Sequence, residues 1–144
     1  MADTSSLYTS FKTGLMGGSF NIDGTDTIKI ALVTGYTFSA AHTKWSDVST
    51  YEITGTGYSS PGATITTTVG SSSTTAQFKI TGNSQTWTSS TITASGAVIY
   101  KYLSGDATNS PLIAWIDFQE SKSSTNGDFA IDWTSVSGVM VALA

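Results

Sequence analysis

Hydrophobic and polar residues alternate with a period of two along most of the chain after residue 18, and this pattern predicts short β-strands separated by turns. In the segment 27–34, Ile28, Ile30 and Leu32 share one face, and the other face is apolar as well. Such a strand is expected to be covered on both sides. The other predicted strands span residues 19–23, 50–54, 64–69, 75–81, 85–88, 90–103, 112–118, 128–133 and 139–143.

Small and polar residues mark the turns between these strands. Gly70–Ser73 is a predicted turn, and the dipeptide Asn126-Gly127 is a strong signal for a tight hairpin turn. Gly96 interrupts the longest predicted strand and indicates a bulge or bend. Trp45–Val48 is expected to form one helical turn or a tight loop. Many short strands of this kind predict an all-β, single-domain β-sandwich or jelly roll.

The N-terminal segment Ser5–Met16 is the exception, and its periodicity predicts one short helix. Leu7, Phe11 and Leu15 recur at four-residue spacing, with Tyr8 beside them, and two glycines follow that would end the helix. A helix this short is expected to need packing to be stable.

This helix divides the chain into an N-terminal helical segment or arm, residues 1–18, and a β-sandwich domain, residues 19–144. Its apolar side chains are the candidate partner-binding residues: Leu7, Tyr8, Phe11 and Leu15. Two arrangements fit them, an arm that reaches a partner or a plug that closes one end of the sandwich. The plug is favoured, because amphipathic faces usually pack internally.

Composition adds that the predicted surface is poor in charge. Charged residues make up only 11% of the chain, against roughly 25% in typical soluble domains. Ser and Thr contribute 23 and 25 of the 144 residues. Because Thr fits the outer face of a strand and Ser favours turns, we expect sheets whose exposed faces carry hydroxyl groups.

Charge and composition argue against several kinds of partner. The formal net charge is −4, and all six basic residues are Lys, which lacks the planar fork with which Arg contacts phosphates and base edges. We therefore expect no nucleic acid as a partner. Without Cys there are no disulfides, and no apolar run approaches ~20 residues. The N-terminus lacks the basic and apolar regions of a secretion signal. These features predict synthesis in a cytoplasm and no membrane partner.

Candidate catalytic and metal-binding residues are sparse, and we expect no enzyme, no cofactor and no metal site. His42 is the only histidine and lies in a polar segment, and the chain has no Gly-x-Ser-x-Gly nucleophile motif. A solvated loop residue is the preferred interpretation. One His and no Cys exclude an ordinary zinc site.

Calcium stays open as an alternative because it needs only oxygen ligands. The acidic residues near predicted turns or strand ends are Asp106, Asp117, Asp128 and Asp132. No EF-hand spacing links them, so solvated, turn-forming carboxylates are preferred. An exposed line of Trp87, Trp115 and Trp133 would indicate carbohydrate binding, but large aromatics more often fill the core of a small sandwich.

Several segments carry a family resemblance by their order and spacing. They are Thr25–Val33, Ser39–His42 with Trp45–Val48, Trp87–Ala94 with Ala97–Lys101, Ser110–Phe118 and Ser123–Phe129. Together they resemble a family of small virion structural proteins of tailed bacteriophages, some of which are capsid decoration, or cement, proteins. The resemblance spans nearly the whole chain and contains no catalytic signature.

The resemblance implies a β-sandwich or jelly-roll subunit, made in the host cytoplasm, that decorates the exterior of the capsid. It also implies a homotrimer that binds the major capsid protein and bridges neighbouring capsid subunits. Two alternatives stay open: a phage tail or fibre component with a glycan-binding role, and a carbohydrate-binding β-sandwich module of an enzyme. Exposed aromatic residues would favour either alternative over the capsid.

Overall fold

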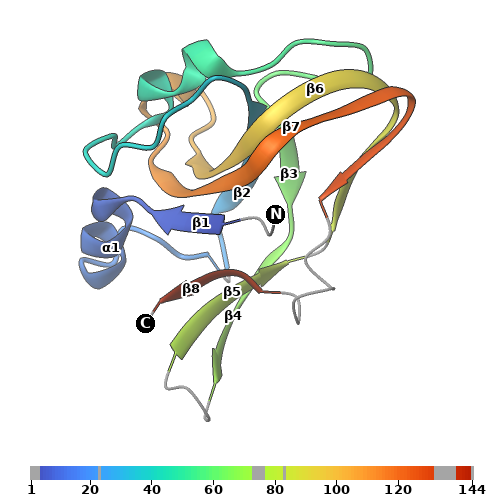
Figure 1. Ribbon diagram of the computed structural model, residues 1–144. Helices are drawn as coiled ribbons and strands as arrows, with labels where there is room; N and C mark the ends of the chain where they lie inside the picture. The colour runs from blue at the N-terminus through green and yellow to red at the C-terminus, as the bar shows by residue number, and fades with distance from the viewer. Residues whose placement is uncertain (1–3, 23, 73–76, 83, 132–138, 144) are drawn as a thin grey trace.

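Two antiparallel sheets dominate the computed structural model, which describes residues 4–22, 24–72, 77–82, 84–131 and 139–143 (Figure 1). The larger sheet has the order β1-β7-β6-β2-β3, and the smaller one has the order β4-β5-β8. The strands are β1 Thr4–Leu7, β2 Thr27–Val33, β3 Ala63–Ile65, β4 Thr67–Ser72, β5 Gln77–Gly82, β6 Gln85–Tyr102, β7 Leu112–Ile131 and β8 Val139–Leu143. The prediction of a mostly β chain with one short helix near the N-terminus is confirmed.

Strands β6 and β7 form a long ribbon that curves strongly along its length (Figure 1). On β6, Ala94 and Gly96 are separated by one residue, while their partners on β7, Lys122 and Asp117, are separated by four. The extra residues include Gln119, whose φ of 62° is left-handed. A bulge of this size bends a strand and increases its twist. The predicted bend at Gly96 is therefore confirmed.

The strong turn signal Asn126-Gly127 lies inside β7, so the predicted hairpin turn is wrong. Asn126 has a φ of 48°, and the register of β7 against β6 shifts between Ser90 and Ile92, at the same level. The dipeptide thus accommodates an extra residue in the strand instead of ending it. Sequence alone does not distinguish these uses, because both require left-handed backbone.

Three other predicted elements differ from the structure. The predicted turn Gly70–Ser73 belongs largely to β4, which continues through Ser72, and Ser73 lies outside the described residues. The predicted strand 50–54 is replaced by a 3₁₀ helix, Ser49–Tyr51, and one isolated bridge at Glu52. No strand forms over residues 19–22, and Asp23 is outside the described part of the chain.

Two further 3₁₀ turns complete the described backbone, Trp45–Asp47 and Ala107–Asn109. The first confirms the helical turn predicted at this position. Its N-cap is Lys44, and the side chain of Asp47 accepts the backbone N–H of Lys44.

Apolar side chains pack on both faces of the five-stranded sheet. Ile28, Ile30 and Leu32 of β2 belong to one cluster, and Ala31 and Val33 belong to the other. The prediction that this strand is covered on both sides is therefore confirmed. The alternation along a single strand decides which side chain enters which cluster.

A bulge reverses part of this alternation in β7. The register shifts between Ile99 and Tyr100, which pair with Ala114 and Leu112, so Ile113 is the extra residue. Leu112 consequently lies in the cluster with Tyr100, while Ile113 and Ala114 both lie in the opposite cluster. A strict period of two would have placed Leu112 and Ala114 together.

A short strand precedes the helix in the described N-terminal part of the chain. Thr4–Leu7 (β1) pairs with β7 at the edge of the larger sheet, and helix α1 spans Thr9–Met16. The prediction of a helix from Ser5 is therefore wrong for its first residues. The edge of β7 offers them unpaired backbone donors and acceptors, and this long-range pairing overrides a weak local helical preference.

Candidate functional site

The four candidate partner-binding residues lie inside the molecule or at its margin. Tyr8 and Phe11 are buried, and Leu7 and Leu15 are half-buried. Leu7, Phe11 and Leu15 pack with the cluster on one side of the sheet, and Tyr8 packs with the cluster on the other side. In the chain by itself these side chains thus pack internally, as a plug would, and their contact with a partner stays a prediction.

Gly14 permits this packing of the helix. A β-carbon at this position would lie 2.7 Å from Cε2 of Phe20. The Phe20 ring instead meets Phe11 edge-on, with ring centroids 5.0 Å apart. A glycine that weakens the helix therefore lets an aromatic side chain cover it.

His42 belongs to a chain of hydrogen-bonding side chains that the sequence did not reveal. The Tyr36 hydroxyl lies 2.8 Å from His42 Nδ1 and 3.1 Å from the hydroxyl of Tyr8. Tyr8 is fully buried, and His42 is half-buried. His42 thus lies in a loop, as expected, but it is half-buried, and its imidazole is hydrogen-bonded to the core residue Tyr36.

Burial shapes the electrostatics of this chain. Desolvation, together with the hydrogen bond shared with Tyr36, raises the pKa of Tyr8 far above its ordinary 10.0, so its hydroxyl stays protonated. Burial also raises the pKa of Tyr36. Nearby, backbone N–H groups of Thr43 and Lys44 donate to Asp47 and hold the pKa of its carboxyl below 3.8. The protonated phenols and the imidazole thus form a hydrogen-bonded chain that supports the loop.

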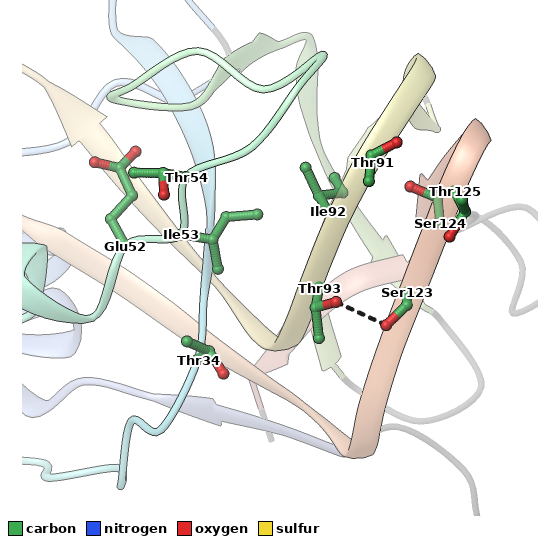
Figure 2. Close-up of a pocket in the computed structure, with 10 residues that line it drawn as sticks. All are labelled: Thr34, Glu52, Ile53, Thr54, Thr91, Ile92, Thr93, Ser123, Ser124 and Thr125. Carbon is green, nitrogen blue, oxygen red and sulfur yellow. Dashed lines mark hydrogen bonds between the residues drawn. The ribbon is translucent and has the colours of Figure 1, made fainter.

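A polar groove has a volume of about 530 Å³. It lies where the half of the β6–β7 ribbon beyond the bend, residues 85–95 and 119–131, faces the segment that follows the 3₁₀ helix Ser49–Tyr51 (Figure 2). Seven of its lining residues carry hydroxyl groups, two are isoleucines and one is acidic. They are Thr34, Glu52, Ile53, Thr54, Thr91, Ile92, Thr93, Ser123, Ser124 and Thr125. We refer to this feature as the hydroxyl groove.

Hydrogen bonds of the hydroxyl side chains on β6 and β7 stabilise the shape of the hydroxyl groove. Thr93 Oγ1 and Ser123 Oγ lie 2.8 Å apart, and join β6 to β7 (Figure 2). Thr91 Oγ1 accepts the backbone N–H of Asn126 at 3.0 Å. Ser90, which is fully buried, lies 2.7 Å from Ser124 Oγ. Side-chain bonds thus add to the backbone pairing of β6 with β7 at Thr93 and span the register shift between Ser90 and Ile92.

The one carboxylate of the hydroxyl groove is already engaged. Tyr58 and Ser60 each donate a hydroxyl hydrogen bond of 2.7 Å to Glu52, one to each carboxylate oxygen. The Tyr58 hydroxyl also accepts the backbone N–H of Leu32. Burial and the negative charge of Glu52 raise the pKa of Tyr58 far above 10.0, so Tyr58 remains a donor. Glu52 therefore acts as a structural acceptor that fixes the loop carrying Tyr58.

The acidic residues considered for calcium do not come together as a site. Among the described residues, no group of three or more His, Cys, Asp or Glu side chains could hold a metal ion. Asp117 accepts the backbone N–H of Gln119, and Asp128 accepts that of Ser89. Both carboxylates thus stabilise a residue with left-handed backbone, Gln119 and Ser89 respectively, at a register shift of the ribbon. Asp132 lies outside the described residues.

The tryptophans that could have stacked against a sugar are core residues where the structure describes them. Trp45, Trp87 and Trp115 are each 5% exposed. Trp45 stacks on Tyr100, with ring centroids 4.6 Å apart. Trp133 lies outside the described ranges. Core packing is therefore the role of these three side chains.

The comparisons with known proteins give no relative. No protein-family model, curated protein or solved structure matches this chain. Within the described residues, no helix has the length and apolar character needed to span a membrane.

Proposed function

We propose that this chain is a virion structural protein, a capsid decoration or cement protein that binds the major capsid protein on the outer shell of a tailed bacteriophage. It acts there as a homotrimer that bridges neighbouring capsid subunits and is not an enzyme. A subunit that binds only the assembled shell stabilises that shell by mass action. Closed symmetry favours a trimer at three-fold positions.

The observation that carries the proposal is the chemistry of the exposed ribbon. The far half of β6–β7 exposes a nearly continuous set of hydroxyl side chains: Thr86, Thr88, Ser89, Thr91, Thr93, Ser121, Ser123 and Thr125. In this half of the ribbon, residues 85–95 and 119–131, the charged residues are Glu120, Lys122 and Asp128. A surface with short side chains and few charges loses little side-chain entropy and little charge hydration when a protein covers it.

The β-sandwich or jelly roll remains the architecture that we propose for the complete subunit. Two antiparallel sheets in one chain support it. A phage tail or fibre component is the second candidate, because the same surface would serve an interface there. A carbohydrate-binding module has less support, since the described tryptophans are buried.

Copy number per virion tests the proposal. Quantitative mass spectrometry of purified virions is expected to find hundreds of copies, as positions on a shell require, whereas about a dozen or fewer would place the chain in the tail. Sedimentation of the purified chain is expected to give a trimer of about 45 kDa, three times the 15.0 kDa of the monomer. Absence of the chain from virions would overturn the proposal.

A further inference from the structure

The hydroxyl groove contains a short stretch of open strand edge. Pairing of β6 with β2 ends at Gly96, opposite Val33. The next backbone bond on this edge runs from Thr91 N–H to the carbonyl of Thr56, at 2.9 Å. Between these points, residues 92–95 of β6 pair with no strand on this edge in the described part of the chain.

Within residues 92–95, Thr93 is the residue whose backbone N–H and C=O point toward the unpaired edge of β6. Because the N–H of Thr91 points to this edge, away from β7, the period of two places the N–H and C=O of Thr93 on the same edge. No described backbone group bonds to Thr93 from that side. Open strand edges pair readily with another extended chain.

The side chains that line the hydroxyl groove indicate which kind of ligand it can bind. The described lining contains no aromatic residue, so it offers no stacking platform for a sugar ring, and no basic residue, so it offers no counter-charge for an anion. The carboxylate oxygens of Glu52 already accept the hydroxyls of Tyr58 and Ser60. The remaining polar groups are neutral donors and acceptors, beside the apolar Ile53 and Ile92 (Figure 2).

The size of the groove agrees with a short segment of chain. Its volume of about 530 Å³ lies inside the roughly 300–1,000 Å³ of typical ligand sites. An extended chain advances by about 3.3 Å per residue, so the open stretch of β6 is long enough to lie beside about four residues.

We propose that the hydroxyl groove binds an extended, uncharged polypeptide segment of a partner protein, which pairs with the open edge of β6 at Thr93. Neutral hydroxyl walls complement a segment without charged side chains. The inference rests on the proposed function, under which the partner is the major capsid protein.

Binding to capsid shells tests the groove. Shells are purified from a virus that lacks the gene for this chain, and the purified chain is added and measured by co-sedimentation. Thr54→Arg and Thr125→Arg each place a long cation in the groove from an exposed position. The control Thr37→Arg places the same side chain on an exposed position outside both the groove and the β6–β7 ribbon. Circular dichroism and the thermal midpoint check that all three variants fold.

The groove variants are expected to bind at least about tenfold more weakly than the wild type, and the control within about twofold. Backbone pairing predicts slowed hydrogen exchange in the peptide covering residues 92–95 when the wild type is bound to shells. Wild-type affinity in Thr54→Arg and Thr125→Arg would overturn the groove but leave the capsid proposal standing. Failure of the wild type to bind shells would overturn both.

Two other occupants are tested with the same proteins. If the occupant were a second copy of this chain, Thr125→Arg would dissociate the oligomer of the purified chain in sedimentation. If it were a neutral glycan, soluble maltohexaose would compete with the shells for the wild type. Either result would overturn the assignment to a partner polypeptide.

Discussion

The indole ring of Trp115 lies against the backbone of Gly96, so closely that a β-carbon at position 96 would overlap with Cη2 and Cζ3 of that ring. The two residues lie on neighbouring strands at the bend of the β6–β7 ribbon, where Gly96 pairs with Asp117. Trp115 is buried and meets Tyr36 edge-on, with ring centroids 5.0 Å apart. The ring is held on its other side, so position 96 must lack a side chain.

Gly96→Ala is therefore expected to lower the free energy of unfolding by about 2–3 kcal/mol, because overpacking forces the ring or the strand to shift. Urea unfolding followed by tryptophan fluorescence measures the loss. Gly127→Ala is the matched control, since a β-carbon there would have its nearest neighbour at 3.7 Å. It is expected to change stability by no more than about 0.5 kcal/mol. Equal effects of the two substitutions would contradict the role assigned to Trp115.

Tyr36→Phe is expected to destabilise the protein by about 1–3 kcal/mol, because it leaves the fully buried hydroxyl of Tyr8 without its described partner. Tyr8→Phe is expected to cost less, about 1 kcal/mol, since the Tyr36 hydroxyl keeps its hydrogen bond with His42. Chemical denaturation of both variants and of the double variant measures the coupling. The double variant should lose less than the sum of the single losses, and simple additivity would argue against a connected chain.

Asp47 is expected to give the protein an acid-sensitive contribution to stability. The N–H of Thr43, above all, and that of Lys44 depress its pKa below 3.8, against an opposing effect of burial. A depressed pKa in the folded state means that this stabilisation is present above pH 3.8 and is lost as the pH falls through the folded value. In urea unfolding, Asp47→Asn should reduce the fall in the free energy of unfolding between about pH 5 and pH 2. The same fall in the variant as in the wild type would refute the assignment.

Alkaline titration should show buried tyrosines. Burial raises the pKa of Tyr8, Tyr58 and Tyr100 far above 10.0, and that of Tyr36 above the same value. Their contribution to stability is therefore fully present below pH 10.0 and is lost as the pH rises above it, because the unfolded chain releases these protons first. Phenolate absorbance should appear in two steps, the second coinciding with loss of the circular dichroism signal. Six tyrosines titrating together in the folded protein would contradict this prediction.

Local patterns predicted the elements that depend on a single strand or turn. The apolar residues of β2 are explained by alternation alone, because both faces of that strand are covered. The helical turn at Trp45 and the bend at Gly96 followed from equally local signals. The hydroxyl-rich exposed face also followed from composition, since Thr and Ser had to lie on the outer faces of the strands.

Bulges and long-range pairs decided the rest. Asn126-Gly127 carries the same left-handed requirement in a hairpin and in a bulge, and the partner strand β6 determines which forms. Thr4–Leu7 form β1 because the edge of β7 pairs with them. His42 joins Tyr36 and Tyr8 only because the fold brings residues far apart in sequence to one place.

The amino-acid sequence by itself thus determined a mostly β chain with a charge-poor, hydroxyl-rich exterior, because burial and strand propensity act residue by residue. Only the tertiary structure decided in which register the strands of the long ribbon pair, which loop faces it, and hence that Thr54 and Thr125 line one groove. Those features depend on pairing between distant segments, whose register no single segment encodes.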